Sequence, residues 1–247
     1  FEDEEIGYNP FNFELAKVLI NDSVQREALK PREQRLFLNF VKEDRHFSKY
    51  YDGISILFKT GLRISEFCGL TVHDINFDEH TFSVNNQLQR TRKGEYIIVP
   101  TKTSAGKRVL PMTKEVEEHF RNIIKEREKP RIEPMIDGKS GFLYLDKNGN
   151  PSVGLHWAHY FKHICQKYNS IYKVQMPTVT PHICRHTYCS NMARSGISAK
   201  TLQYLMGHSD ISVTLNVYTH LGLEDAQQEL KQLEKRANSQ TSKVVNF

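Results

Sequence analysis

The sequence has no long hydrophobic run, and this absence excludes the class of membrane-spanning proteins. A transmembrane helix needs about 20 consecutive apolar residues. The longest apolar stretches here, such as Ile54 to Phe58, have only the length of core segments. The first residues are acidic and lack the basic-then-apolar order of a secretory signal peptide. We therefore expect a cytoplasmic protein without a membrane partner.

Cysteine is scarce. The four cysteines form no C-x-x-C pair, which argues against a disulfide framework and against a zinc cluster built from cysteines. We expect reduced, mostly buried thiols at Cys68, Cys165, Cys184 and Cys189.

Motifs for metal ions and nucleotides are missing as well. His182 and His186 lie four residues apart, but Ile183 stands where the zinc-protease motif requires glutamate. No third metal ligand follows at a usual spacing, and there is neither a G-x-x-x-x-G-K-[ST] loop nor a carboxylate cluster. We expect no metal ion and no cofactor, and we interpret His186 as structural.

Charge, by contrast, is abundant. The 34 lysines and arginines outnumber the 29 aspartates and glutamates, which gives a net charge of +5. Four of the acids occupy positions 2–5, so the rest of the chain is more basic than this value indicates. A basic body favours a polyanionic partner such as double-stranded DNA, although charge alone does not identify one.

The residue pattern predicts an α+β domain, mainly helical, with a small three-stranded antiparallel sheet. Pro31 is well placed to open a helix, and Gly61 to end the next one. Valine, isoleucine and threonine then predict strands near 81–88, 95–101 and 108–111, with one further short strand near 141–145. The predicted helices cover about 31–42, 47–59, 63–69, 114–128, 154–168, 181–195, 198–206, 211–217 and 223–237.

Two early segments carry candidate phosphate ligands. Arg63 follows Gly61 and opens a helix, where an arginine and exposed backbone N–H groups can together hold a phosphate. The alternative is a surface arginine paired with Glu66 three residues later. Lys102 lies at a predicted hairpin tip, from which it can reach a ligand or remain a solvated turn lysine.

Two later segments add histidines, an arginine and a tyrosine. His182 and Arg185 lie three residues apart, so they share one face of a predicted helix. Gly207 interrupts the next helix and leaves His208 directed toward a site. Tyr218 follows near the end of another short helix, but it is one of 11 tyrosines and spacing alone does not select it.

Taken in order, these segments resemble the tyrosine recombinase family, which includes the integrases of phages and conjugative transposons. The order Arg, Lys, His-x-x-Arg, His, Tyr recurs here over residues 60–220, most of the chain. The separation of His208 from Tyr218 is ten residues, one more than in many members, which affects only the local geometry of that helix. Thr219 and His220 follow the tyrosine as the family pattern requires.

The resemblance implies a mechanism of DNA strand cleavage and rejoining through a 3′-phosphotyrosine, without metal or ATP. In it, Tyr218 attacks the phosphate, which Arg63 and Arg185 bind through fixed guanidinium donors. Lys102 protonates the leaving 5′ oxygen, and His182 assists proton transfer at the nucleophile. The resemblance further implies that His208 donates a hydrogen bond to a phosphate oxygen and that Glu66 orients Arg63 or a neighbouring histidine.

The resemblance also implies an organisation for the chain, which begins with Phe1 and is interpreted as a fragment. Residues 1–29 are expected to link to a missing upstream DNA-binding domain, and 30–222 to form the catalytic domain. The helix and tail at 223–247 carry one apolar stripe, which packs either on its own domain or on a neighbouring protomer. Its members are Leu223, Ala226, Leu230, Leu233 and Ala237.

The implied partners are double-stranded DNA, further copies in a tetrameric synapse, and an excisionase-type accessory protein in the bacterial cytoplasm. Basic residues on the predicted sheet and its turns are candidate DNA contacts, with a solvated surface as the alternative. They are Arg90, Arg92, Lys93, Lys107 and Arg108. A type IB topoisomerase shares this chemistry and is the nearest rival interpretation. A DNA-binding module without catalysis is another, which the complete residue set disfavours.

Overall fold

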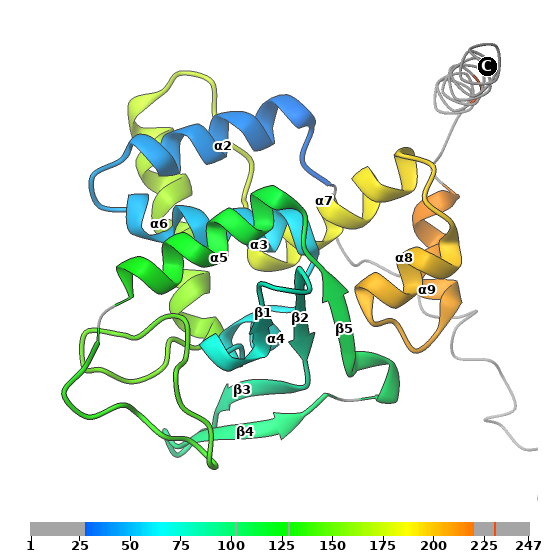
Figure 1. Ribbon diagram of the computed structural model, residues 1–247. Helices are drawn as coiled ribbons and strands as arrows, with labels where there is room; N and C mark the ends of the chain where they lie inside the picture. The colour runs from blue at the N-terminus through cyan, green and yellow to red at the C-terminus, as the bar shows by residue number, and fades with distance from the viewer. Residues whose placement is uncertain (1–27, 102, 128, 220–229, 231–247) are drawn as a thin grey trace, which may run out of the picture.

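The computed structural model describes residues 28–101, 103–127, 129–219 and 230. Helices dominate, and short strands occupy the middle of the chain (Figure 1). The helices are α2 (Pro31–Glu43), α3 (Tyr51–Thr60), α4 (Ile64–Cys68), α5 (Lys114–Glu126), α6 (Gly154–Ile171), α7 (Pro181–Arg194), α8 (Ala199–Met206) and α9 (Ile211–Tyr218). The strands are β1 (Ile75–Asn76), β2 (Thr81–Val84), β3 (Asn86–Arg90), β4 (Tyr96–Pro100) and β5 (Arg108–Pro111). Short 3-10 turns lie at Ser48–Tyr50, Val72–Asp74 and Ser104–Gly106.

The predicted fold class is confirmed, but the strands form two sheets rather than one. The segment expected as one strand at 81–88 divides at Asn85, because asparagine is a poor strand former and the in–out alternation of side chains breaks there. β2 lies between β1 and β5, whereas β3 pairs with β4. The strand expected at 141–145 was wrong, since this segment makes only isolated bridges.

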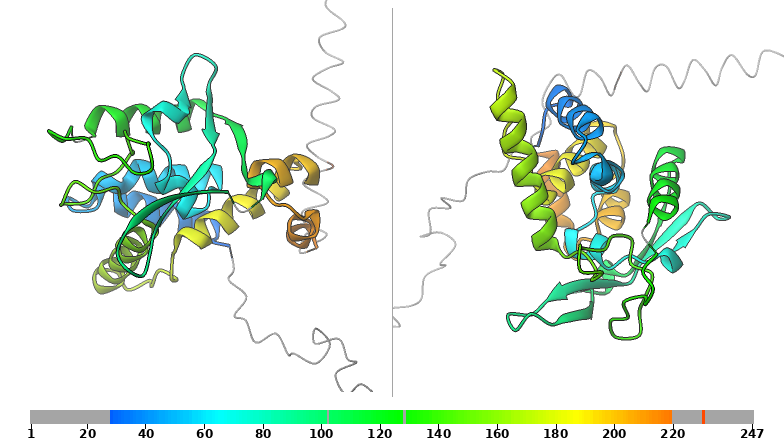
Figure 2. Two further views of the ribbon diagram at one scale, coloured as in Figure 1. Left: turned by 90° about the horizontal axis from the view of Figure 1, so that it is seen from below. Right: turned by 90° about the vertical axis from the view of Figure 1, so that its left-hand side faces the viewer.

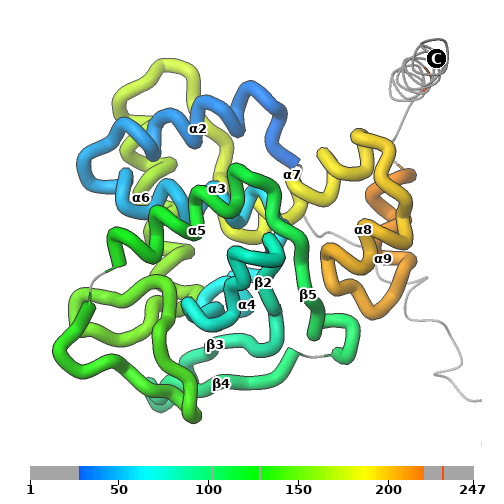
Figure 3. The backbone as a smooth tube through the Cα atoms, viewed as in Figure 1, coloured from blue at the N-terminus to red at the C-terminus, as the bar shows by residue number. Residues whose placement is uncertain are grey.

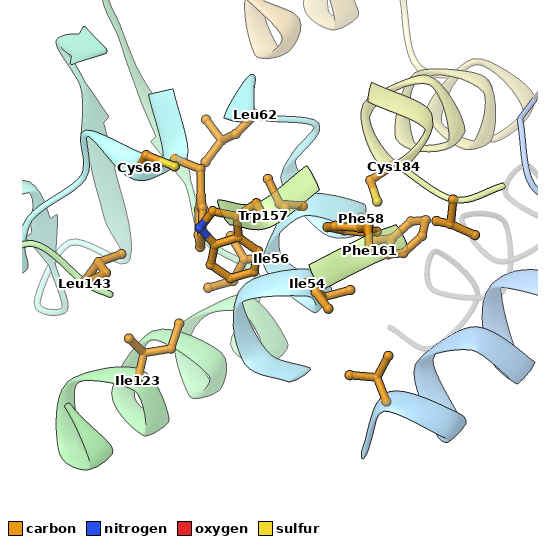
Figure 4. Packing of buried hydrophobic residues seen from close by; sticks show 14 of the residues in the cluster. Ile54, Ile56, Phe58, Leu62, Cys68, Ile123, Leu143, Trp157, Phe161 and Cys184 are labelled. Carbon is orange, nitrogen blue, oxygen red and sulfur yellow. The ribbon is translucent and has the colours of Figure 1, made fainter. Parts of the chain in front are cut away.

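A single central helix anchors the main core. In α3 the side chains from Ile54 to Phe58 are all buried, so this helix is covered on every side. Trp157 and Phe161 of α6 pack beside it (Figure 4), and the Phe161 ring stacks on Phe37 of α2 at 5.8 Å between centroids. The smoothed backbone trace shows α2, α5 and α6 around α3 (Figure 3).

Helix α7 joins this core to a second, smaller one. Its first half contributes Ile183 and Cys184 to the main core, and its second half contributes Cys189 and Ala193 to a cluster with α8 and α9. The helix begins as predicted, with the Thr180 side chain accepting a hydrogen bond from a backbone N–H of the first turn. The middle of α7, which includes Arg185, therefore lies between the two cores.

The helical pair α8–α9 lies beside β5 at one edge of the molecule (Figure 2). The Tyr204 hydroxyl of α8 donates a hydrogen bond of 2.7 Å to the carbonyl oxygen of Val109 in β5. The β3–β4 hairpin extends from the helical body (Figures 1 and 2). No helix among the described residues is long and apolar enough to cross a membrane. Most of the expected linker at 1–29 and of the tail at 223–247 lies outside the described residues.

Candidate active site

Two helices end at glycines in the left-handed conformation, and their ends define the site. Gly61 closes α3 with φ of 63°, and Gly207 closes α8 with φ of 62°. A Cβ atom at Gly61 would lie 2.4 Å from Tyr188 Cδ1, and one at Gly207 would lie 2.6 Å from Arg108 Nη1. Both positions thus need glycine for conformation and for space.

Arginine side chains bind the carbonyl oxygens that these helix ends leave without helical partners. Arg185 donates from Nη1 to the Gly61 oxygen (2.6 Å) and from Nη2 to the Met206 oxygen (2.7 Å). Arg63 donates from Nη2 to the Gly207 oxygen (3.1 Å). A helix C-terminus attracts cations. These contacts hold Arg185 at both helix ends and Arg63 at the end of α8. Arg63 and Arg185 are brought together as expected.

The buried carboxylate of Glu66 lies behind Arg63. The Arg63 Nη1 group donates to Glu66 Oε1 at 2.8 Å, and the Arg63 backbone N–H donates to the other carboxylate oxygen at 3.1 Å. The Glu66 side chain has no exposed surface, whereas that of Arg63 is 37% exposed. Arg63 is consequently held by a buried carboxylate while part of its side chain faces solvent.

The structure corrects the prediction for Arg108. This residue was predicted to contact DNA from the surface, but its side chain is fully buried and pairs with Glu66 at 3.1 Å. It also donates to the carbonyl oxygens of Leu205 (3.0 Å) and Gly106 (2.8 Å). Because Arg108 opens β5 with its side chain toward α4 and α8, the prediction of a surface contact is wrong.

The site carries more positive charge than its one carboxylate neutralises. Burial, together with the charges of Arg63 and Arg108, lowers the pKa of Arg185 to about 9. An anion placed between the guanidinium groups would relieve this repulsion. Each guanidinium has five N–H donors, and the bonds described above use two of those on Arg63 and two of those on Arg185. The arrangement suits a phosphate group.

His208 follows the Gly207 cap and enters the same charged region. Burial and the charges of Arg185, Arg63 and Arg108 lower its pKa to about 4, so the imidazole is neutral near pH 7. Its Nδ1 atom lies 2.9 Å from the Thr214 hydroxyl of α9. When that hydroxyl donates to Nδ1, the proton remains on Nε2 and is available to a ligand oxygen.

Tyr218 lies in the last turn of α9 and packs against the α7–α8 cluster. Its hydroxyl donates a hydrogen bond of 2.6 Å to the carbonyl oxygen of Ile197, in the connection between α7 and α8. His182 is exposed in the first turn of α7, and Lys102 lies outside the described residues. The described parts thus bring together Arg63, Arg185 and His208.

The remaining candidates for DNA contact are exposed. Arg90, Arg92 and Lys93 surround the turn of the β3–β4 hairpin, and Lys107 directly precedes β5. Arg90 lies over the Tyr96 ring at 5.4 Å and donates to the Gly94 oxygen. Within the described part of the chain, no group of three histidine, cysteine or acidic side chains could hold a metal ion.

Sequence reasoning assigned no site role to Thr214. It lies one helical turn before Tyr218, and its side chain is buried although most of α9 is exposed. A threonine among the largely apolar residues of α9 gives no sequence signal of such a role, because its contact with His208 depends on how the loop after α8 folds.

Comparison with known protein families gives a match over most of the chain. The model of the phage integrase family matches residues 27–224, most of the chain. The chain belongs to this family.

Curated relatives of this integrase-family chain include transposon proteins. The transposase from transposon Tn916 of Enterococcus faecalis is 40% identical over 235 residues, which cover 95% of this chain and 58% of that protein. The integrase of Staphylococcus phage L54a is 31% identical over 180 residues, covering 71% of this chain and 49% of the integrase. The chain therefore spans 58% of the length of the first relative and 49% of the length of the second.

Solved structures of a related integrase share the fold. The Tn1549 transposon integrase in complex with circular intermediate DNA has a TM-score of 0.80 and 42% identity, covering 92% of this chain and 73% of that one. A structure with transposon right end DNA has a TM-score of 0.83 and 41% identity, covering 94% and 73%. XerA recombinase, at 19% identity and a TM-score of 0.60 over 83% and 62%, shares the fold alone.

Proposed function

We propose that this chain is the catalytic part of a site-specific DNA recombinase that integrates and excises a conjugative mobile element. The observation that carries the proposal is the pair of guanidinium groups of Arg63 and Arg185, fixed beside two glycine-capped helix ends. His208 reaches the same region, and Tyr218 lies on the following helix. The Tn1549 integrase, a relative at 42% identity, is described in complex with circular intermediate DNA.

The reaction follows from the charges of the site. Arg63, Arg185 and His208 bind the non-bridging oxygens of the scissile phosphate and stabilise the charge that develops on them. The Tyr218 oxygen attacks phosphorus, and the bond from phosphorus to the 5′ oxygen breaks. The phenol proton leaves with assistance from His182, and Lys102 supplies a proton to the 5′ oxygen.

Rejoining is the reverse of this step. A 5′ hydroxyl attacks the phosphotyrosine, forms a new phosphodiester and releases the Tyr218 phenol, so every bond broken is replaced by another phosphoester. The energy of the bond is conserved, and the reaction needs neither ATP nor a metal ion.

Recombination also requires partners beyond this chain. We infer that further copies assemble as a tetramer on two double-stranded DNA sites in the bacterial cytoplasm, with an excisionase-type protein favouring excision. Residues 1–29 would connect to an upstream DNA-binding domain, 30–222 would be the catalytic domain, and 223–247 would dock on a neighbouring protomer. The greater length of the relatives supports the upstream domain, since this chain spans 58% of the Tn916 transposase.

The exposed hairpin is the proposed sequence-reading or backbone-binding element. Arg90, Arg92 and Lys93 present three cations at one tip, and Lys107 adds a fourth on the neighbouring turn. Phosphate contacts release counterions, so removing them lowers the salt dependence of binding. The double variant Arg92→Gln/Lys93→Gln should bind more weakly and show a shallower slope of log affinity against log salt. An unchanged slope would contradict this role.

Trapping on a nicked duplex of Tn1549 circular-intermediate sequence tests the proposed chemistry. The nick lets the cleaved end diffuse away, so a covalent protein–DNA adduct accumulates and is detected in a denaturing gel. We expect the adduct with the parent chain and none with Tyr218→Phe, while both bind the duplex equally. An adduct with Tyr218→Phe would overturn the choice of nucleophile. Strand exchange between two such duplexes would then separate a recombinase from a topoisomerase.

A further inference from the structure

Arg108 has a burial and a bonding pattern that its position on a short strand does not require. Its side chain has no exposed surface, although charged side chains are rarely fully buried. The Nη2 group donates to Glu66 Oε2 at 3.1 Å, and Nη1 lies 3.4 Å from the second carboxylate oxygen. Nη1 further donates to the Gly106 oxygen at 2.8 Å, and Nε to the Leu205 oxygen at 3.0 Å.

These contacts join three segments that are distant in the sequence. Glu66 belongs to α4 and holds Arg63 from behind. Leu205 lies in the last turn of α8, two residues before the Gly207 cap and three before His208. Gly106 belongs to the turn that leads into β5. One guanidinium therefore connects the support of a phosphate-binding arginine to the helix end that presents the histidine.

Stability alone does not explain this arrangement. A buried ion pair gains little over apolar packing of similar volume, because taking both charges out of water offsets their attraction. A methionine or leucine could fill the space of Arg108. The guanidinium instead supplies directed bonds to two sides at once, which apolar packing cannot supply.

We propose that Arg108 is a positioning residue for DNA strand cleavage, which sets Arg63 through Glu66 and His208 through the end of α8. The inference rests on the proposed function. Arg108 itself does not touch the phosphate, because its side chain is buried behind Glu66 and Gly207.

The positioning role of Arg108 predicts a particular pH dependence of cleavage, through the ionisation of Glu66. Burial alone raises the pKa of Glu66, but the attraction and hydrogen bonds of Arg108, followed by those of Arg63, outweigh it and hold the pKa below its ordinary value. Arg185 and His208 face the same carboxylate. Without Arg108, burial is opposed mainly by Arg63, so the pKa of Glu66 rises. A protonated Glu66 no longer pairs with Arg63, and cleavage then weakens as the pH falls.

The test compares Arg108→Met with the parent chain in single-turnover cleavage of the nicked duplex. We expect the rate of cleavage to fall about 100-fold, the loss typical of a misplaced catalytic group. The affinity for the DNA should stay within about threefold of the parent value, which is less than the tenfold change that corresponds to about 1.4 kcal/mol. The ratio of parent rate to variant rate should grow as the pH is lowered from 8 to 5.5. In Arg108→Met/Glu66→Gln, which has no carboxylate to titrate, this growth should disappear.

Arg127→Met is the matched control. Arg127 is also a largely buried arginine that pairs with a carboxylate, Glu133, and donates to a backbone oxygen, that of Phe142. It belongs to the segment after α5, away from the site, so its loss should lower the unfolding free energy and leave cleavage at saturating folded protein unchanged. Equal losses of cleavage in Arg127→Met and Arg108→Met would overturn the proposal.

Two further outcomes keep the test decisive. If Arg108→Met does not fold, Arg108→Lys replaces it, because lysine keeps the charge but cannot bind Glu66 and Leu205 together. Parental cleavage by either variant at every pH would overturn the positioning role. A parent chain that binds the duplex without forming an adduct would instead count against the proposed function.

Discussion

The Tyr218 hydroxyl donates a hydrogen bond of 2.6 Å to the carbonyl oxygen of Ile197. In the proposed reaction the phenol must give up this proton when its oxygen attacks phosphorus. We therefore expect Tyr218 to leave the Ile197 acceptor when DNA binds, through a movement of the last turn of α9.

We expect DNA binding to change the surroundings of Tyr218 before cleavage. Incorporation of 3-fluorotyrosine at position 218 allows the change to be followed by 19F NMR. The resonance should move when an uncleavable duplex with a non-hydrolysable phosphate analogue is added. A 3-fluorotyrosine at position 144 should not respond, because Tyr144 is partly buried against the main core and its hydroxyl accepts a hydrogen bond from the Gly53 N–H. A resonance at 218 that stays fixed on a fully bound chain would contradict the exchange.

Thr214 couples His208 to the helix that carries Tyr218. Its hydroxyl lies 2.9 Å from His208 Nδ1, and the residue is fully buried. In Thr214→Val the shape is kept and the hydrogen bond is lost, so His208 no longer holds one tautomer. A bond of about 1 kcal/mol corresponds to roughly a fivefold to tenfold slower single-turnover cleavage. Thr214→Ser should cleave at the parental rate, and equal rates for both variants would refute the coupling.

The ionisation of His208 should appear in the pH dependence of stability. Burial and the neighbouring arginines lower its pKa from 6.5 to about 4. As the pH falls below the unfolded value of 6.5, the unfolded chain binds a proton that the folded chain refuses until about pH 4. The stability that the neutral His208 side chain contributes is therefore complete above pH 6.5 and is lost progressively as the pH falls toward 4.

We therefore expect His208→Gln to lose less unfolding free energy than the parent when the pH is lowered from 7 to 5. Urea denaturation at each pH measures the difference, and the other histidines cancel because both chains contain them. Parallel losses in the two chains would show that His208 keeps an ordinary pKa in the folded protein.

Gly207→Ala should damage both stability and cleavage. The left-handed conformation costs an alanine about 1 kcal/mol, and the added Cβ would lie 2.6 Å from Arg108 Nη1 and 3.1 Å from the Ala105 carbonyl oxygen. Gly149→Ala isolates the first cost, because Gly149 has φ of 77° and no atom within 4 Å of an added Cβ.

Urea denaturation and single-turnover cleavage distinguish the two glycines. Gly149→Ala should lose about 1 kcal/mol and cleave normally. Gly207→Ala should lose more and cleave more slowly, since Arg108 and Arg63 must shift. Identical behaviour of the two variants would mean that the helix cap tolerates a side chain.

The sequence predicted the helices well, because Gly61, Gly207 and Pro181 are local signals that act regardless of tertiary contacts. It also predicted that Arg63 and Arg185 share a site. The sheets were less predictable. Whether β2 and β3 form one continuous strand depends on their pairing partners. These partners, β5 and β4, come later in the sequence.

Arg108 shows the same limit within the site. The sequence around Arg108 predicts a basic strand on the surface, and its neighbours Lys107 and Val109 are indeed exposed. Because side chains alternate along a strand, that of Arg108 lies on the opposite, buried side, where it pairs with Glu66. The orientation is set by the register of β5 against β2, which the sequence does not specify.

In the proposed function, the division of the strands into two sheets places the expected DNA contacts and the candidate active site on different sheets. Ser65 of α4 bonds to Gln87 at 3.1 Å, so the base of the β3–β4 hairpin is anchored while its tip is exposed. Strand β5, which places Arg108, belongs to the other sheet. If the tip contacts DNA as proposed, substitutions there should change the preferred insertion site without altering the site around Arg63 and Arg185. Residues 89–97 are then the segment to exchange in order to redirect insertion.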